Sequence, residues 1–594
     1  MKKILMGNEA VALSLYLNGV NVVTGYPGTP STEVIETLKN FKDDDFYVEW
    51  STNEKVALEV AAGASISGAR TVVTMKQVGL NVAADPLLSL SMIGVEGGMI
   101  IYVADDPGPH SSQTEQDTRN FARFCNLPIF DPSSPKEAFE LIGTAFEISE
   151  KYKIPVIFRM TTRVCHSNED IEFEFERKKR NVTGFSKDPK WVILPSLSYK
   201  KHIELEEKLQ SMSYELGIYN KVHNKGKIGI ITSGVSYYYV LEAIKDFDDL
   251  FSVMKVTISH PIDKNLIIKF AKDKESIIFF EELDPVIEEE CKIILFENNI
   301  SIKTFGKRSG HVKYAGEFNT DYIKEVLNSI IECQINKDIN DEINKNSLFL
   351  RTPELCAGCP HRNSFLAINE ASKGTKVIFT GDIGCYTLGA AKPISTTDTC
   401  LCMGASITMG QGIKIVEKDA KVFTFIGDST FFHSGMTGIA NAIYNNHNLV
   451  LCILDNLTTG MTGFQPHPGT GKKVDGTLAP NIEIEKVLTG LGIQKILILD
   501  PYENLEILIK KIKEFTSDDD ICAIIFRREC INITKKVRSY KINLDKCIKC
   551  RICLYKTGCP AIFEEDNKIK IDTNICFGCN LCSFYCKHNA IEEA

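Results

Sequence analysis

Eight cysteines in the last part of the chain have the spacing of metal ligands. One run consists of Cys547, Cys550, Cys553 and Cys559, and a second run consists of Cys576, Cys579, Cys582 and Cys586. Cysteine thiolates ligate iron–sulfur clusters and zinc, and a close triplet followed by a fourth cysteine is typical of [4Fe–4S] clusters. An Ala-Ile pair follows each run, which marks an internal duplication. The spacing predicts a pair of metal centres that carry electrons.

This duplicated segment resembles the bacterial two-cluster ferredoxins. In that family the fourth cysteine of each run ligates the cluster of the other run. The resemblance implies one [4Fe–4S] cluster on Cys547, Cys550, Cys553 and Cys586, and a second on Cys559, Cys576, Cys579 and Cys582. The first run departs from the family because five residues, not the usual three, separate Cys553 from Cys559. In the second run Lys587 replaces a common proline. A pair of four-cysteine zinc sites is the alternative.

A second group of residues could bind a divalent cation. Gly427-Asp428 closes one strand-like segment, and Asn456 closes the next. This pattern resembles the GDG…N motif of thiamine-diphosphate enzymes, with Ser429 in place of the usual second glycine. The resemblance implies that Asp428, Asn456 and the carbonyl of Thr458 coordinate Mg²⁺, which prefers octahedral oxygen ligands.

The segments around this motif support the same interpretation. LDNLTTGMTGFQPHPG follows the second strand, and it is too rich in Gly, Pro and apolar residues for a simple linker. His433 and His467 lie in these segments, where we expect them to shape a cofactor pocket. A helix expected after Gly435 would present its N-terminus to the diphosphate. The alternative is that the strand-end Asp428 only caps a helix.

The N-terminal region offers a carboxylate for catalysis. The stretch WSTNEKVALEVAAGASISGAR predicts a helix that begins near Asn53. In thiamine enzymes a glutamate of a second domain bonds the aminopyrimidine ring and drives loss of the C2 proton. Glu54 has the position of that glutamate in pyruvate:ferredoxin oxidoreductases, whereas we expect Glu59 to be an ordinary helix residue. Upstream, GYPGTPSTE resembles their YPxTPSS segment, which implies that Thr29 faces a 2-oxoacid. The alternatives are that Glu54 only interacts with the dipole of its helix, and that GYPGTPSTE is only a proline-fixed turn that caps a helix.

Four further cysteines could hold a third cluster. Cys356 and Cys359 form a CxxC pair, Cys385 follows in GDIGC, and Cys530 follows the last strand of this region. In related pyruvate enzymes cysteines in this order hold the cluster nearest thiamine. The alternative is that all four are small buried residues.

Alternating strand and helix patterns must position these groups. They predict an α/β fold of doubly wound parallel-sheet domains. We expect a pyrimidine-binding-type domain in residues 1–180, a transketolase-C-like domain in 225–310, a thiamine-diphosphate/Mg-binding domain in 350–535 and a ferredoxin-like domain in 538–594. The last has few apolar residues, so metal clusters would have to stabilise it.

Composition excludes several classes of protein. The formal charge of −9, without a basic block, argues against nucleic-acid binding. Asn8 and Glu9 interrupt the first apolar run, and no apolar stretch reaches the length of a membrane span, which predicts neither a signal peptide nor a membrane protein. Eight of the twenty cysteines have metal-ligand spacing near the end of the chain, which suits a reducing compartment, so we expect a cytoplasmic protein.

The order of these segments, with LCAGCPHR, GDIGCYTLG and MTGFQPHPG, resembles the large (alpha) subunit of the indolepyruvate ferredoxin oxidoreductase family over nearly the whole chain. The resemblance implies oxidative decarboxylation of aryl 2-oxoacids, chiefly indole-3-pyruvate, with CoA to the acyl-CoA. Two electrons would pass through the clusters to ferredoxin, and a small beta subunit would be the partner. The alternatives are a non-oxidative thiamine-dependent decarboxylase and an electron-transfer subunit with a relic thiamine fold.

Overall fold

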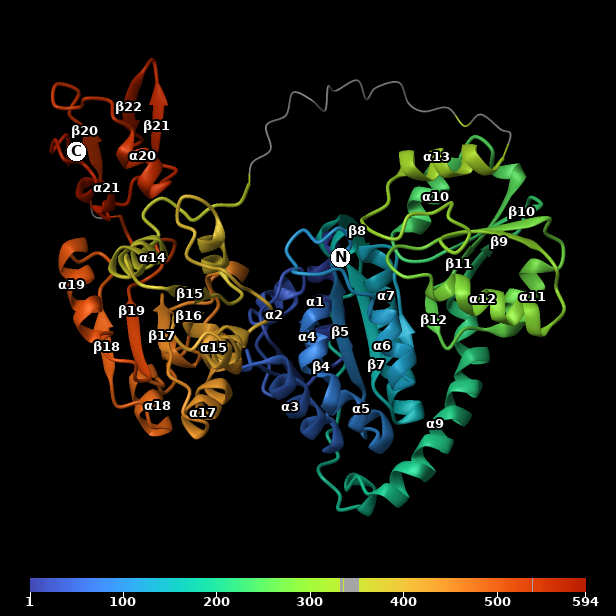
Figure 1. The fold of residues 1–594 in the computed structure, drawn as a ribbon. Coiled ribbons are helices and arrows are strands. Elements are labelled where there is room, and N and C mark those ends of the chain that lie inside the picture. The colour runs from blue at the N-terminus through green and yellow to red at the C-terminus, as the bar shows by residue number, and fades with distance from the viewer. Residues whose placement is uncertain (332–334, 336–351, 537) are drawn as a thin grey trace. The chain divides into compact units, whose positions relative to one another are not determined.

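The computed structural model describes residues 1–331, 335, 352–536 and 538–594 (Figure 1). The chain divides into two compact units, Met1–Ser347 and Leu348–Ala594. Each unit is built on parallel sheets covered by helices, which confirms the α/β class predicted from the sequence. Among the described helices, none combines the length and the apolar composition that a membrane span needs.

The first unit contains a seven-stranded sheet. Its strand order is β12-β6-β7-β5-β4-β2-β3, with bounds Ile258–His260, Ile129–Phe130, Val156–Thr161, Met99–Asp105, Thr71–Lys76, Val22–Gly25 and Tyr47–Val48. All pairs are parallel except β12 with β6. Every residue of β5 is buried, as expected for a strand with helices on both faces. A separate antiparallel pair joins β1 (Lys2–Met6) to β8 (Asn168–Glu172).

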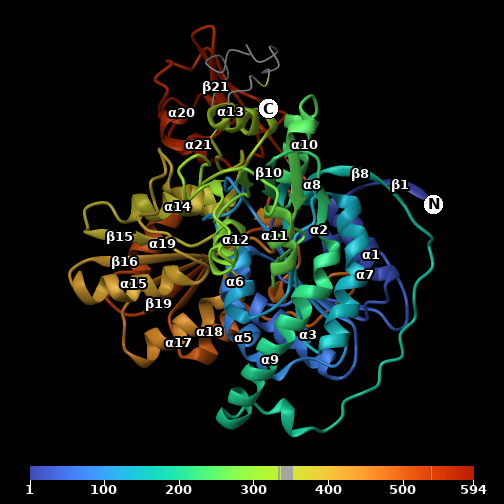
Figure 2. The same cartoon turned by 90° about the vertical axis from the view of Figure 1, so that its right-hand side faces the viewer.

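Helices cover both faces of this sheet. The first eight are α1 (Gly7–Leu17), α2 (Thr32–Leu38), α3 (Glu54–Ile66), α4 (Gln77–Val82), α5 (Ala84–Ile93), α6 (Thr118–Cys125), α7 (Pro135–Tyr152) and α8 (Thr162–His166). Helices α1 and α7 lie side by side (Figures 1 and 2), and the Ser14 hydroxyl of α1 donates to the Phe139 carbonyl of α7. Helix α3 packs against β2 and β4 instead.

A second sheet in the same unit has the order β14-β13-β10-β11-β9. Its strands are Lys303–Phe305, Ser276–Phe280, Ile228–Thr232, Phe251–Lys255 and Lys221–His223, and its helices are α10 (Ser236–Ile244), α11 (Lys264–Ala271), α12 (Val286–Glu297) and α13 (Thr320–Ile330). Helix α9 (Pro195–Leu216) precedes it. Strand β12 follows β11 in the chain but pairs with β6 of the first sheet, so the two sheets are directly connected.

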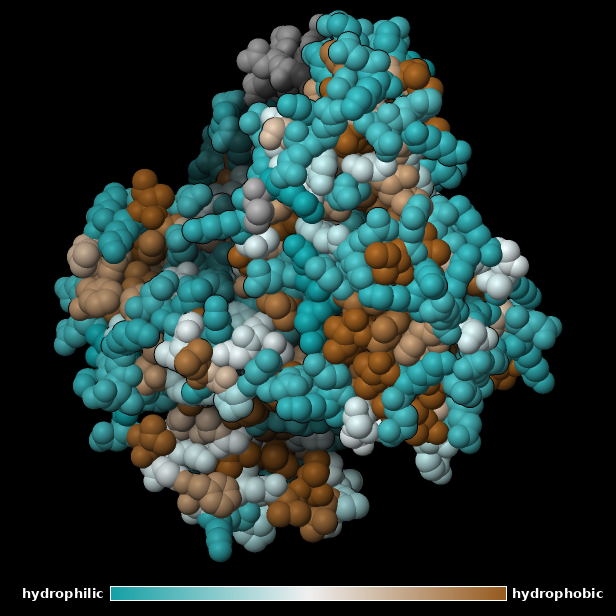
Figure 3. All heavy atoms as spheres, turned by 90° about the vertical axis from the view of Figure 1, so that its left-hand side faces the viewer, coloured by the Kyte–Doolittle hydropathy of each residue, from teal (hydrophilic) through white to brown (hydrophobic). Residues whose placement is uncertain are grey.

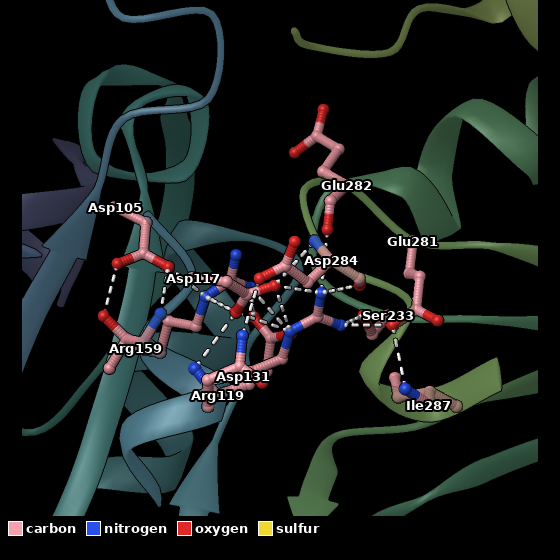
Figure 4. A network of polar contacts seen from close by, with 12 residues as sticks. Asp105, Asp117, Arg119, Asp131, Arg159, Ser233, Glu281, Glu282, Asp284 and Ile287 are labelled. Carbon is pink, nitrogen blue, oxygen red and sulfur yellow. Dashed lines mark hydrogen bonds and ion pairs between the residues drawn. The ribbon is translucent and has the colours of Figure 1, made fainter. Parts of the chain in front are cut away.

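Buried ion pairs join the two sheets (Figure 4). Arg119 in α6 lies 2.7 Å from Glu281, which follows β13, and 2.6 Å from Asp117. Arg159 in β7 forms a second set within the first sheet, with Asp105 at 2.6 Å and Asp131 at 2.9 Å. Removing one partner of such a pair leaves an uncompensated buried charge, so we infer that the Arg119–Glu281 pair helps to hold the two sheets together.

The second unit contains a five-stranded parallel sheet of order β15-β16-β17-β19-β18. Its strands are Val377–Thr380, Lys421–Gly427, Val450–Asp455, Cys522–Arg527 and Ile496–Leu499, and its main helices are α14 (Pro360–Ala371), α15 (Ala405–Val416), α17 (Met436–Tyr444), α18 (Ile484–Leu491) and α19 (Leu505–Phe515). Alternate residues of β16 face opposite cores: Phe423 and Phe425 lie in one, Val422 and Ile426 in the other. This alternation buries both faces of the sheet.

The C-terminal segment of this unit is small. Strand β20 (Tyr540–Ile542) pairs with β23 (Ile591–Glu593), and β21 (Ile562–Glu565) pairs with β22 (Lys568–Ile571). Two short helices, α20 (Ile552–Thr557) and α21 (Leu581–Phe584), lie at matching places in the two cysteine runs. Its core includes buried cysteines among a few apolar residues, so cysteine ligation could supply much of its stability.

Candidate active site

The predicted cation ligands lie at the carboxyl end of the parallel sheet in the second unit. Asp428 follows β16 and Asn456 follows β17, and these strands are neighbours in register. Ligands of open α/β sheets bind at this edge. Asp428, Asn456 and Thr458 are all buried.

Oxygen atoms of these three residues converge. The Asn456 amide oxygen lies 2.7 Å from the Thr458 carbonyl oxygen and 3.2 Å from each Asp428 carboxylate oxygen. Its one donor contact, with the Thr458 N–H, is long at 3.3 Å. Crowded acceptors repel one another unless the amide turns over or a cation lies between them. An octahedral Mg²⁺ with bonds of about 2.1 Å places adjacent ligands about 3 Å apart, so this donor set fits the ion.

Two histidines complete the surroundings of these oxygens. His467 Nε2 lies 3.0 Å from Asp428 Oδ2. Burial raises the pKa of Asp428, but His467 and the Ser429 N–H outweigh burial and the pKa is lowered, so Asp428 is a carboxylate. His361 Nε2 lies 3.4 Å from Asn456 Nδ2, and burial lowers its pKa to about 4, so it is neutral. Sequence reasoning missed His361, although it stands in the LCAGCPHR motif.

The helix after β16 starts earlier than the sequence predicted. It begins at Asp428 with α16 (Asp428–Thr430), continues through a π-helical turn (Phe431–Gly435) and runs on as α17. The expected start after Gly435 is therefore wrong, because the π turn keeps the helix continuous. His433 lies buried in that turn, and the Ser429 hydroxyl accepts a hydrogen bond from Thr459 at 3.0 Å. Gly427 packs against Tyr386, where an added Cβ would come within 2.5 Å of the ring.

Asp382 is a further residue that sequence reasoning did not select. Its carboxylate accepts the N–H groups of Gly404 and Ser406 at 2.9 and 3.0 Å, which fixes the loop before α15. Like Asp428, it belongs to a Gly-Asp pair that follows a parallel strand, β15. That shared strand-end position is the signal that could have found it.

Glu54 lies buried at the N-terminus of helix α3. It is the first residue of α3, whose N-terminus is capped by Asn53 accepting from Val56 N–H at 2.8 Å. The Glu54 side chain is buried and packs against Gly79 of α4. Glu59, the rival carboxylate, is exposed and pairs with Lys55. Burial thus separates the two candidates, while the catalytic role of Glu54 remains a prediction.

Thr29 lies at the same sheet edge as Glu54. Its carbonyl accepts the Ser111 hydroxyl at 3.1 Å, and the Ser111 carbonyl in turn accepts Lys76 Nζ at 3.2 Å. Asp106 accepts the N–H groups of Ser111 and Ser112 at 2.8 and 3.0 Å. Sequence reasoning missed Lys76 and Asp106, because each is only a charged residue at or next to a strand end.

The two cysteine runs line two separate hollows. Cys547, Cys550, Cys553 and Cys586 line one of them. Cys559, Cys576, Cys579 and Cys582 line the other. These are the two ligand sets that the ferredoxin resemblance implied. In the described part of the chain no three Cys, His, Asp or Glu side chains could share one metal ion.

The candidate third set lies beside the cation ligands. Burial first, and then Cys530 and Cys356, raise the pKa of Cys385 to about 11, so these two cysteines lie near enough to Cys385 to act on it electrostatically. Cys359 has Cys356 and Cys385 as neighbours in the same way. The Cys530 N–H donates to the Asn456 carbonyl at 3.0 Å. A Cβ on Gly460 would lie 3.5 Å from Asn456 Nδ2 and 3.8 Å from Cys385 Sγ.

Helix α14 connects this third set to the second hollow. Gly358 and Arg362 line that hollow, and Arg362 donates to the Thr557 and Gly558 carbonyls at 2.8 Å. Asn363 donates to the Cys579 carbonyl at 3.4 Å. The cation ligands, the third cysteine set and the second hollow therefore follow one another through the second unit.

Known families match both parts of the chain. "Pyruvate flavodoxin/ferredoxin oxidoreductase, thiamine diP-bdg" matches residues 14–214, and "Thiamine pyrophosphate enzyme, C-terminal TPP binding domain" matches residues 382–525. The indolepyruvate oxidoreductase subunit IorA of Thermococcus kodakarensis is 40% identical over 99% of this chain and 96% of its own length. The subunits of the same name from Pyrococcus horikoshii and Archaeoglobus fulgidus are 38% and 35% identical, over 100% of this chain and 97% and 98% of their own lengths.

Proposed function

This chain belongs to the family of indolepyruvate oxidoreductase subunits IorA, and we propose that its substrates are aryl 2-oxoacids, chiefly indole-3-pyruvate. It is the catalytic subunit of a thiamine-diphosphate-dependent 2-oxoacid:ferredoxin oxidoreductase. In the proposed reaction the 2-oxoacid and CoA give the arylacetyl-CoA and CO₂. Two electrons leave the substrate and pass to ferredoxin.

The observation that carries this proposal is the contact between the cation ligands and the third cysteine set. The Asn456 carbonyl accepts from the Cys530 N–H, and Asn456 and Cys385 both lie beside Gly460. A decarboxylase that released an aldehyde would have no electrons to remove from this position. Cysteines next to the cofactor ligands favour an oxidative reaction over the non-oxidative alternative.

Residues of the second unit would hold the cofactor's diphosphate. Asp428, Asn456 and the Thr458 carbonyl hold Mg²⁺, and the helix that begins at Asp428 directs backbone N–H groups toward phosphate. Gly427, Ser429 and His433 flank these ligands. When bound, thiamine diphosphate supplies the electron sink that decarboxylation needs. Glu54 would hold the aminopyrimidine ring through a hydrogen bond and supply the carboxylate for proton transfer there, and Thr29 would face the 2-oxoacid.

Two [4Fe–4S] clusters would occupy the two hollows, and a third would occupy Cys356, Cys359, Cys385 and Cys530. The cluster in the first hollow would be the last on the electron path, because Cys550 is exposed there. The second hollow instead lies against α14. A cytoplasmic location would keep all these thiolates reduced.

A small beta subunit completes the proposed enzyme. The face drawn in Figure 3 carries apolar patches between polar ones. Val416, Tyr444 and Leu478 in the second unit are 78%, 85% and 86% exposed. Single exposed apolar side chains are common on protein surfaces, so the proposal of a partner rests on the relatives, which are named as subunits of an oxidoreductase.

Anaerobic assay of the chain with its partner tests the proposal. Indole-3-pyruvate, CoA and thiamine diphosphate together should reduce a viologen dye and yield indole-3-acetyl-CoA, and omission of any one should stop the reaction. Indole-3-acetaldehyde without dye reduction would instead establish the non-oxidative decarboxylase. Iron and sulfide without retained thiamine diphosphate would establish the electron-transfer subunit.

A further inference from the structure

Lys76 is a cation at the sheet edge that holds Glu54 and Thr29. It is the last residue of β4 and directly precedes α4, which carries Gly79. Its side chain runs across Gly28, where an added Cβ would come within 2.9 Å of Lys76 Cδ. A side chain at position 28, next to Thr29, would push the lysine out of this place. The ammonium thus reaches the loop that the sequence placed against the substrate.

The hydrogen-bonding capacity of this ammonium is largely unused. Among the described residues it donates one hydrogen bond, to the neutral Ser111 carbonyl at 3.2 Å. An ammonium has three donors, so two remain for a ligand or for water. Lys76 is largely buried, and its burial lowers its pKa although Asp106 and Glu54 act to raise it. An anion bound beside Lys76 would raise the pKa that burial lowers and so stabilise the charged ammonium.

The two nearby carboxylates have other partners. Asp106 accepts from the Ser111 and Ser112 N–H groups and from the Thr162 hydroxyl, the last at 2.7 Å. Glu54 packs against Gly79. Both acids attract Lys76 electrostatically, but among the described residues its one hydrogen bond goes to the Ser111 carbonyl. Surface lysines such as Lys55 instead pair directly with a glutamate.

We propose that the Lys76 ammonium binds the carboxylate of the incoming 2-oxoacid. This inference rests on the proposed function, because it assumes that a 2-oxoacid reaches the edge that carries Glu54. The buried Glu54 repels a substrate carboxylate, and a cation in the same place offsets that repulsion. Decarboxylation converts the carboxylate into neutral CO₂, which the ammonium does not attract. Lys76 therefore binds the substrate but not the CO₂ that leaves.

Steady-state kinetics of Lys76→Met and Lys76→Arg with indole-3-pyruvate provide the first test. Loss of a charge-assisted hydrogen bond should raise KM about 10- to 100-fold in the methionine variant. The arginine variant should recover much of this loss because it keeps the charge. Lys55→Met is the matched control, since Lys55 is exposed and adjacent to Glu54 in sequence, and its KM should stay unchanged.

A binding experiment separates charge recognition from structural damage. Indole-3-propionate and its neutral amide have the substrate's carbon skeleton but cannot react, and calorimetry can measure both on the thiamine-loaded enzyme. The wild-type protein should bind the acid more tightly than the amide, and Lys76→Met should lose this preference while keeping its affinity for the amide.

Three results would overturn the inference while leaving the proposed function intact. They are an unchanged preference for the acid in Lys76→Met, a loss of thiamine diphosphate from that variant, and a rise in the KM for CoA alone. A wild-type enzyme that reduces no dye would overturn the proposed function itself, and this inference with it.

Discussion

The Glu54 carboxylate lies directly over the backbone of Gly79. A Cβ placed on Gly79 would come within 2.5 Å of Glu54 Oε1 and 2.7 Å of its Cγ. Gly79 lies in an ordinary helical turn of α4, so its conformation does not require glycine. The absence of a side chain at this position is what lets a buried carboxylate occupy the sheet edge.

Glu54→Gln should nearly abolish turnover. An amide of the same shape cannot take a proton, so we expect kcat to fall about 100-fold or more while the protein stays folded. Viologen reduction under anaerobic conditions measures the loss, and visible absorption of the clusters measures integrity. Glu59→Gln is the control, because Glu59 is exposed. An active Glu54→Gln protein would refute the assignment.

Gly79→Ala should impair the enzyme through Glu54. The new methyl group would displace the carboxylate, and misplacement by about 1 Å lowers rates on the order of 10- to 100-fold. Gly63→Ala is a matched control in α3, because a Cβ there meets no atom within 4 Å. The same kcat for both variants would show that Glu54 tolerates the methyl group or has no role in turnover.

Asn456→Ala should weaken cation binding. Removing one of three converging oxygens should raise the Mg²⁺ concentration that gives half-maximal activity by about 10-fold or more. Chelation should also release thiamine diphosphate from the wild-type protein, and added Mg²⁺ should reverse the release. Asn445→Ala, at an exposed helix end, should respond like wild type. Retention of the cofactor after exhaustive chelation would argue that the Asn456 amide is turned over and no metal binds.

Sequence patterns located residues that follow strands within a recognisable spacing. Asp428 and Asn456 could be placed at neighbouring strand ends because parallel strands put their carboxyl ends together. Lys76, Asp106 and His361 could not, because each is a single charged or polar residue whose neighbours come from distant segments.

Long-range contacts and helix continuity were also beyond the sequence. Arg119 and Glu281 pair across 162 positions, and neither carries a motif. The π-helical turn before α17 continues the helix through Gly435, although a glycine in the sequence usually favours a helix end. Such features depend on packing between elements rather than on local preference.

Cys385→Ser tests the third cysteine set. If four cysteines hold a cluster there, the iron content should fall from roughly twelve to roughly eight atoms per chain. Dye reduction should fall with it, because the electron path from the cofactor would be broken. Cys402→Ser is the control, since Cys402 is exposed and belongs to none of the proposed sets. Roughly eight irons in the wild-type protein would exclude the third cluster.

Glu282 should make the first unit less stable as pH rises. Burial raises its pKa from 4.5 to about 7, with the Phe318 N–H, at 2.8 Å from its Oε1, and Arg159 acting in the opposite direction. Between these two values the folded chain keeps a proton that the unfolded chain has lost. The folded state is therefore penalised progressively from pH 4.5 to about pH 7, and by about 3 kcal/mol above that range.

Glu282→Gln removes that penalty, since an amide stays neutral and can still accept from Phe318. The variant should unfold at higher urea concentration than wild type at pH 8, and the difference should shrink toward pH 5. Glu297→Gln, an exposed residue at the end of α12, should show no such trend. A difference that stays constant with pH would mean that Glu282 is ionised in the fold, and the buried network of Figure 4 would then carry one more negative charge than we assign to it.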